Sequence, residues 1–149
     1  MNQLFKLTTL IGLLVIAACS PTEIPSKDLI ERQGLTYEVN SQTPFSGSSV
    51  DYHSNGQLLT KSNYKDGKRD GLWEYFGENG QLRFKSNYKD GKEDGLQESY
   101  YENGQLQTKF NGKDGQEHGL YESYDENGQL KDKICFKNGE EVDMSNCEK

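Results

Sequence analysis

The sequence predicts an all-β protein, an elongated single-layer antiparallel meander of four β-hairpin repeats. Three observations lead to this prediction. The motif Asn-Gly-Gln-Leu recurs every 24 residues, starting at Asn55, Asn79, Asn103 and Asn127. Asp-Gly or Asn-Gly turns recur with the same spacing, at 66–67, 90–91, 114–115 and 138–139. Between the turns lie short runs with many aromatic residues, such as 71–76 and 81–88, which read as strands.

The first 18 residues are interpreted as an export signal. Lys6 precedes the apolar run 10–16, which is too short to span a bilayer because a spanning helix needs about 20 residues. The segment Ile16-Ala17-Ala18-Cys19 resembles a bacterial lipobox, so we expect Cys19 to carry acyl chains that anchor the protein stably. The alternative is an ordinary secretory signal that is cut after Ala18 and leaves Cys19 as a free thiol.

Residues 19–34 are expected to form a flexible tether. Pro21 and Pro25 interrupt the segment, its charge is mixed and it shows little periodicity. About 15 extended residues reach about 50 Å, enough to hold the repeats clear of the lipid headgroups. Position 20 is serine, and the segment looks like those of Gram-negative lipoproteins, in which aspartate there retains the protein in the inner membrane. That resemblance implies a lipid-anchored protein of the cell envelope, at the outer membrane.

The repeat domain is predicted to span residues 35–149. Its units are 47–70, 71–94, 95–118 and 119–143. Residues 35–46 are expected to supply a half repeat, with Tyr37 and Phe45 as its apolar contacts, that caps the first edge of the sheet. Residues 144–149 are expected to cap the other end.

The loop length sets the register of each hairpin. A three-residue loop, Glu78-Asn79-Gly80, places Phe76 opposite Leu82, whereas a two-residue loop would place it opposite Arg83. We favour the first because it gives an aromatic–leucine pair in every unit. The other pairs are Tyr52–Leu58, Tyr100–Leu106 and Tyr124–Leu130.

Regular alternation in that register assigns the side chains of each hairpin to two faces. The more buried face is expected to carry Leu72, Glu74, Phe76, Leu82, Phe84, Ser86 and Tyr88. The opposite face is expected to carry Trp73, Tyr75, Arg83, Lys85, Asn87 and Lys89.

The last unit has a cysteine, Cys135, where the earlier units have asparagine. With Cys19 lipidated, Cys135 and Cys147 are the remaining thiols, and an exported protein meets an oxidising compartment. We therefore expect a disulfide that folds the tail over the last strand. The alternative is a pair of free thiols.

The repeat pattern resembles the bacterial variant of the MORN repeat. The pattern is glycine, a bulky pair, an aromatic residue, Glu-Asn-Gly-Gln-Leu, then Asn-Tyr-Lys-Asp-Gly-Lys and glycine again. The resemblance covers about residues 34–143 and is strongest in 71–94, whereas the third unit departs from it at Phe110-Asn111-Gly112. Proteins of this kind are often grouped with YwqK-type antitoxins, so the resemblance implies protein binding and immunity against a toxin.

The composition argues against nucleic acid as a partner and against catalysis. The formal charge is −7, from 17 basic and 24 acidic residues, and removing Lys6 with the signal makes it −8. Polar residues recur in columns rather than in one asymmetric cluster, so we expect no enzyme activity. Two histidines, His53 and His118, are too few for a metal site, and no cofactor is expected.

Two charged columns and two aromatic residues are the candidates for binding. The columns are Lys61, Lys85, Lys109 and Lys133, and Glu74, Glu98 and Glu122. A spacing of about 9.6 Å would let an extended charged partner follow either column, and the alternative is a solvated face. Glutamates on the more apolar face would need hydration or a partner. Trp73 and Tyr121 are candidate interface anchors, although Trp73 could instead pack on Lys85.

Two functions remain open on this evidence. The first is a membrane-anchored scaffold that binds a protein or an envelope polymer. The second is an antitoxin or immunity protein.

Overall fold

The computed structural model describes residues 23–147. The expected export signal, Cys19 and its expected lipid lie outside these residues, as do 148–149. Within the described part of the chain, no helix is long and apolar enough to cross a membrane.

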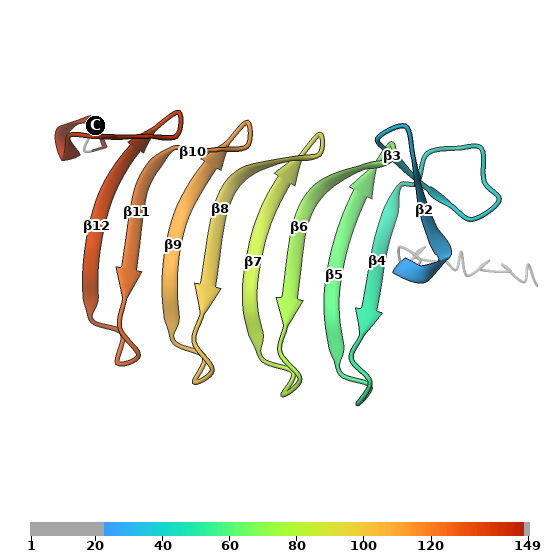
Figure 1. Cartoon of the computed structure of the whole chain (residues 1–149), viewed down its shortest axis with the longest axis horizontal. Helices are drawn as coiled ribbons and strands as arrows, with labels where there is room; N and C mark the ends of the chain where they lie inside the picture. Colours follow the sequence, from blue (N-terminus) through green and yellow to red (C-terminus); the bar gives the residue numbers. More distant parts are fainter. Residues whose placement is uncertain (1–22, 148–149) are drawn as a thin grey trace, which may run out of the picture.

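The repeats form one antiparallel meander, as the sequence predicts. Figure 1 shows the strands side by side in a single layer, with hairpin turns along two opposite edges. Strand order follows the sequence from β4 to β9 and continues through β11, β12 and β13. The bounds are β4 Gly47–Tyr52, β5 Leu58–Lys65, β6 Lys68–Phe76, β7 Leu82–Lys89, β8 Lys92–Tyr100, β9 Leu106–Lys113, β10 Gln116–Glu117, β11 Gly119–Tyr124, β12 Leu130–Lys137 and β13 Glu140–Val142.

The predicted hairpin register is confirmed in all four units. Phe76 pairs with Leu82, and the equivalent pairs are Tyr52–Leu58, Tyr100–Leu106 and Tyr124–Leu130. The loop closes as expected, since the Gly77 amide donates to the Gln81 carbonyl at 2.9 Å. Gly80 has a φ of 75°, the left-handed conformation that a three-residue loop requires.

The predicted assignment of side chains to faces is wrong beyond Leu82. Tyr75 pairs with Phe84 rather than with Arg83, so one residue of β7 has no partner on β6 and the strand bulges there. The extra residue reverses the side on which every later residue of β7 points. Phe84, Ser86 and Tyr88 therefore share a face with Trp73 and Tyr75.

Successive units are also joined through the turns at the other end of the strands. The Gly91 amide donates to the Arg69 carbonyl at 2.8 Å. The equivalent bonds run from Gly67 to Phe45, from Gly115 to Glu93 and from Gly139 to Glu117. Each turn therefore rests on the unit before it, and the bond that links neighbouring units repeats along the array.

The amino-terminal end is more ordered than the predicted tether. Strand β1, Glu23–Pro25, pairs in parallel with Ser48–Val50 of β4, and the 3-10 turn η1, Ser26–Asp28, follows it. Strands β2, Leu29–Arg32, and β3, Leu35–Glu38, form a separate two-stranded sheet. The expected tether 19–34 is therefore wrong from residue 23 onward, because this segment covers the first edge of the main sheet.

The expected half repeat 35–46 is partly wrong. Phe45 packs as predicted, since it is 4% exposed and its ring centroid lies 5.6 Å from that of Tyr64. Tyr37 instead pairs with Ile30 and lies under the Arg32 guanidinium, 4.1 Å from the ring centroid. The segment thus covers the first turns of the array without adding a strand to the main sheet.

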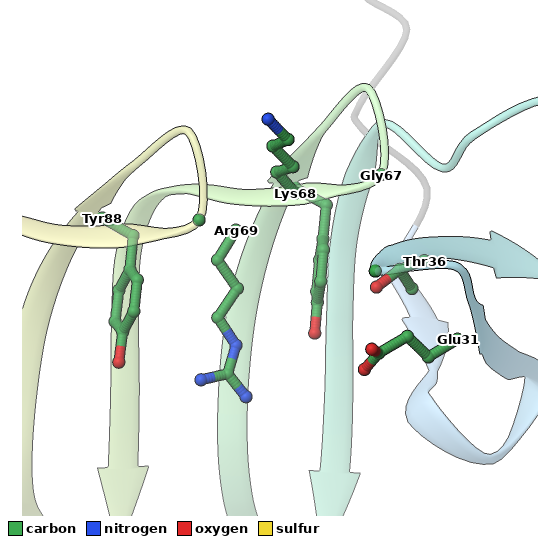
Figure 2. Close-up of a pocket in the computed structure, with 9 residues that line it drawn as sticks. Glu31, Thr36, Gly67, Lys68, Arg69 and Tyr88 are labelled. Carbon is green, nitrogen blue, oxygen red and sulfur yellow. The ribbon is translucent and has the colours of Figure 1, made fainter.

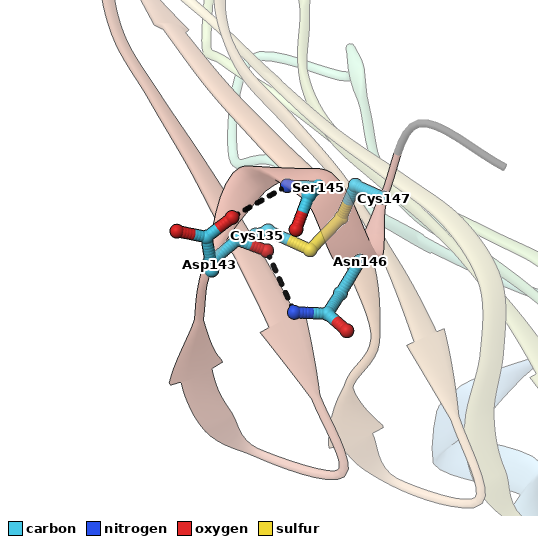
Figure 3. Close-up of a disulfide and its surroundings, with 5 residues drawn as sticks. All are labelled: Cys135, Asp143, Ser145, Asn146 and Cys147. Atoms are coloured by element: carbon cyan, nitrogen blue, oxygen red, sulfur yellow. Dashed lines mark hydrogen bonds between the residues drawn. A yellow bond between two sulfur atoms is a disulfide. The ribbon is translucent and has the colours of Figure 1, made fainter.

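The carboxyl-terminal end is closed by a disulfide between Cys135 and Cys147, the pair that the sequence analysis expects. Strand β13 pairs with Cys135–Lys137, and η2, Met144–Asn146, then turns the chain back. Asp143 accepts a hydrogen bond from the Ser145 amide at 2.9 Å and fixes this turn (Figure 3). Among the described residues the buried apolar side chains are Phe45, just before β4, Val50 in β4 and Cys135 in β12, so they lie at the two ends of the array.

Candidate functional site

The lysine and glutamate columns form one row on one side of the sheet, not two separate columns. Strand pairing places the residues in the order Lys61, Glu74, Lys85, Glu98, Lys109, Glu122 and Lys133. We call this row the charge ladder and its side of the sheet the ladder face. The expectation that the glutamates share a face with Phe84 is wrong, because the bulge at Arg83 brings the lysines to their side.

Ion pairs neutralise much of the charge ladder. Lys85 pairs with Glu98, and Lys109 pairs with Glu122 at 2.5 Å. The Glu122 side chain is 12% exposed and also accepts a hydrogen bond from the Tyr124 hydroxyl at 2.9 Å. Its hydrogen bond with Lys109 raises the pKa of Lys109 and lowers the pKa of Glu122. These contacts make the ladder primarily a device that holds neighbouring units together.

We call each lysine–glutamate pair between neighbouring units a rung of the ladder. The first rung, Lys61–Glu74, differs from the later ones. Phe76 stands where the later units have Tyr100 and Tyr124, so it offers no hydroxyl to Glu74. Lys61 pairs with Glu23 of β1 at 2.5 Å, and this hydrogen bond raises the pKa of Lys61. The ladder therefore fastens the amino-terminal edge strand to the array.

The opposite side of the sheet, which we call the aromatic face, carries a row of rings. Trp73 lies 6.5 Å from Tyr75 and 5.6 Å from Phe84, measured between ring centroids. Farther along, Tyr121 lies 6.0 Å from Phe110 and 6.3 Å from Phe136. Both predicted anchors, Trp73 and Tyr121, therefore lie on the aromatic face, away from the ladder.

Small buried residues support the Trp73 ring. Ser62 and Ser86 pair with Trp73 from the two neighbouring strands and are 5% and 0% exposed. Trp73 is itself half-buried, whereas Tyr75 is 38% exposed. The short serines leave room for the indole, which contacts Tyr75 and Phe84 rather than Lys85. The alternative packing of Trp73 on Lys85 is therefore wrong.

One arginine completes the aromatic face near its amino-terminal end. The Arg69 guanidinium carbon lies 5.4 Å from the Tyr88 ring centroid and 5.9 Å from that of Trp73. Figure 2 shows Arg69 with the Tyr88 ring on one side and Glu31 on the other, in a surface cavity of about 380 Å³. Arg69 forms no salt bridge within residues 23–147, and its guanidinium lies near the hydroxyls of Tyr64 and Tyr88.

The hydroxyl of Tyr88 is held in place beside this arginine. It donates a hydrogen bond to Glu93 at 3.1 Å, and burial together with Glu93 raises the pKa of Tyr88. The ring therefore stays neutral and fixed near neutral pH. We call Arg69, Trp73, Tyr75, Phe84 and Tyr88 the aromatic–arginine cluster.

Sequence reasoning missed Arg69 and Tyr88. The signal was present, because Arg69 is a cation where the later units have Glu93 and Glu117.

Within the described range, no group of three or more metal-binding side chains lies together.

The comparisons with known proteins identify a repeat pattern. The family described as MORN repeat variant matches residues 46–66, 69–90, 93–114 and 117–138, more than half of the chain. No curated protein matches.

Two solved structures are similar to part of this chain. The crystal structure of TarM is 11% identical over 78% of this chain and 21% of that chain, with a TM-score of 0.41. A mutant of S. aureus TarM in complex with Fondaparinux, alpha-GlcNAc-glycerol and UDP is 12% identical over 77% of this chain and 21% of that chain, with a TM-score of 0.40. The chain therefore spans about a fifth of the length of these two proteins.

Proposed function

The chain belongs to the MORN repeat variant family, and we propose that it is a non-enzymatic scaffold whose aromatic face binds a protein at the cell envelope. The observation that carries this proposal is the aromatic–arginine cluster. Figure 1 shows β6 to β12 in a single layer, with the separate β2–β3 sheet only at the amino-terminal end, where Glu31 and Thr36 line the cavity at Arg69.

The residue types of the cluster are those that dominate protein interfaces. Tryptophan, tyrosine and arginine are enriched among the residues whose truncation weakens binding most. Here the neighbouring serines and the Tyr88–Glu93 hydrogen bond hold the rings before any partner arrives. A preformed surface loses less conformational entropy on binding than a flexible one, which favours affinity.

The charge ladder, by contrast, supports the scaffold rather than the contact. Its lysines are matched by glutamates on neighbouring strands, so the ladder face does not present a row of one sign. An extended polyanion or polycation would have to displace these pairs. A protein on the aromatic face needs no such displacement.

Anchoring completes the proposal. Lipid on Cys19 would lie four residues before Glu23, the first residue of β1. Four extended residues reach about 13 Å, so the first edge of the sheet would sit close to the membrane surface. Immunity against a toxin is the alternative implied by the family resemblance, and no contact among residues 23–147 favours it over a general scaffold.

The test is affinity capture from native membranes with the full-length acylated protein. We expect Trp73→Ala and Arg69→Ala each to reduce capture of a discrete protein partner at least fivefold, because each removes an interface anchor. Glu126→Gln is the control, since Glu126 is exposed in a distant turn. Capture that is unchanged in both cluster variants contradicts the assignment of the face.

The identity of the captured material separates the alternatives. One toxin bound at equal stoichiometry would favour immunity, and envelope polymer without protein would contradict the proposal. Cys19→Ser is expected to release the protein from membranes, and retention of that variant would contradict lipid anchoring.

A further inference from the structure

Within residues 23–147, the neighbour of β12 on its outer side, β13, leaves more than half of that strand unpaired. The equivalent strands β5, β7 and β9 each pair with the next unit along the lower part of the sheet. β12 pairs with β13 only through Cys135–Lys137. Leu130–Ile134 therefore has a partner on its inner side alone, and Leu130 is 53% exposed.

The disulfide keeps the tail away from this open segment. After Val142 the chain turns through η2, and Cys147 bonds back to Cys135, with the two α-carbons 5.9 Å apart. Figure 3 shows the tail gathered around Cys135 at one end of β12. The described tail thus covers the upper part of the edge and leaves Leu130–Ile134 accessible.

The strand pairs that join neighbouring repeat units show what kind of strand fits such an edge. The lysine equivalent to Lys133 always faces a glutamate of the next unit, in the pairs Lys61–Glu74, Lys85–Glu98 and Lys109–Glu122. Lys133 has no such outer glutamate among the described residues. The Lys133 Nζ lies 3.9 Å from the Oε1 of Glu122, on the inner side of β12. The Lys133 side chain is 43% exposed.

We propose that Leu130–Ile134 receives an extended acidic strand of a partner protein, paired antiparallel, with a carboxylate on Lys133. Main-chain hydrogen bonds would supply much of the affinity, as in other complexes in which a peptide extends a sheet. The carboxylate would supply the selectivity, since opposite charges across strands attract and like charges repel. This inference deepens the proposed function, because it rests on the chain being a protein-binding scaffold.

A second copy of the chain does not fit this edge. The first edge strand, β4, is covered by β1 through Ser48–Val50, and Val50 faces Lys61 where later units have glutamate. Another copy would therefore present valine to Lys133. Antiparallel pairing of two β12 strands would bring like charges together, because Lys131 and Lys133 lie close in the same strand. Charge complementarity selects an acidic strand of a different protein.

The experiment uses two six-residue peptides and the full-length protein. One peptide has the sequence of Gly119–Tyr124, the last strand that meets a lysine in this way, and the other replaces its glutamate with lysine. We expect the acidic peptide to shift the backbone amide NMR signals of Leu130–Ile134. Lys133→Glu should weaken binding of the acidic peptide at least fivefold and reverse the preference between the two peptides.

Lys113→Glu is the matched control, because it makes the same change in net charge at an exposed position on another strand. Equal affinity of the native protein for both peptides, signal shifts confined to the aromatic face, or no binding would each overturn the inference. If the peptides fail while Trp73→Ala still abolishes membrane capture, the edge assignment is wrong and the scaffold function stands. If the peptides bind while capture is unaffected by both cluster variants, the edge assignment stands and the aromatic face is not the contact.

Discussion

At the scale of single residues, the unit of stabilisation is a lysine on one strand with a glutamate and a tyrosine, two residues apart, on the neighbouring strand. Glu122 accepts from both Lys109 and Tyr124, and Glu98 accepts from both Lys85 and Tyr100. Because the glutamates are mostly covered, these hydrogen bonds are worth more than fully exposed pairs. The triad explains how a sheet with little buried apolar surface keeps its strands in register.

The stability of the protein should depend on the ionisation of Glu122. Its pKa is lowered in the folded state, chiefly by Lys109, so its contribution is complete above the ordinary value of 4.5 and is lost as the pH falls through the folded value. Glu122→Gln should cost about 0.5–1 kcal/mol at pH 7 and less at pH 3. Urea unfolding at both pH values measures this, with Glu126→Gln as control. A cost that is equal at the two pH values would contradict the ionic role.

The tyrosine of the triad can be tested in both directions. Tyr100→Phe removes the hydroxyl that donates to Glu98 at 3.1 Å and should lower the free energy of unfolding by about 0.5–1 kcal/mol. Phe76→Tyr places a hydroxyl two residues after Glu74, as Tyr100 lies two residues after Glu98. This variant should raise the free energy of unfolding by a similar amount. Thermal and urea unfolding would show the two opposite shifts. A loss of stability in both variants would refute the equivalence of the rungs.

At the scale of elements, the hairpins could be predicted from the sequence but the faces could not. The turn motif and the aromatic–leucine pair sufficed to predict the Phe76–Leu82 register. The extra residue at Arg83 was missed because regular alternation was assumed along β7. The opposite charges of Glu74 and Lys85 carried the missing information, since those residues pair only if a bulge intervenes.

The amino-terminal strand was missed for a different reason. Three residues, Glu23–Pro25, are too few to show alternation, and they pair through the backbone in parallel with β4. Likewise, only part of the aromatic–arginine cluster could be predicted from the sequence. Trp73 stands out in the sequence, whereas Arg69 and Tyr88 come together with it only through the bulge and the turns.

Opening the carboxyl-terminal cap should affect stability mainly in the strands next to it. The disulfide closes a short loop, with a sequence separation of 12, and its loss should cost about 3 kcal/mol. Because Cys135 pairs with Leu120 in the last unit, we expect faster hydrogen exchange in β11, β12 and β13 of a Cys147→Ser variant. Exchange in β5 to β8 should stay near that of the native protein. Faster exchange over the whole sheet would contradict nearest-neighbour stabilisation.

At the scale of the whole molecule, the sheet is a one-dimensional array in which each unit contacts only its neighbours. Deleting residues 71–94 joins Asp70 to Gly95 and restores the same turn, ladder and register with one unit fewer. We expect this variant to fold as a shorter sheet with a native-like circular dichroism spectrum. Its urea m-value should fall because less surface is buried.

The control for that deletion removes one residue fewer, 71–93. Its strand after the junction is displaced by one residue, which moves Leu96 and Glu98 to the aromatic face and Gln97 to the ladder face. Lys61 would then face Gln97 instead of Glu98, and this lysine–glutamate pair would be lost. This variant should unfold at lower urea than the 24-residue deletion by at least the cost of one rung. Equal stability of the two deletions would show that the period of 24 residues does not determine the pairing of neighbouring units.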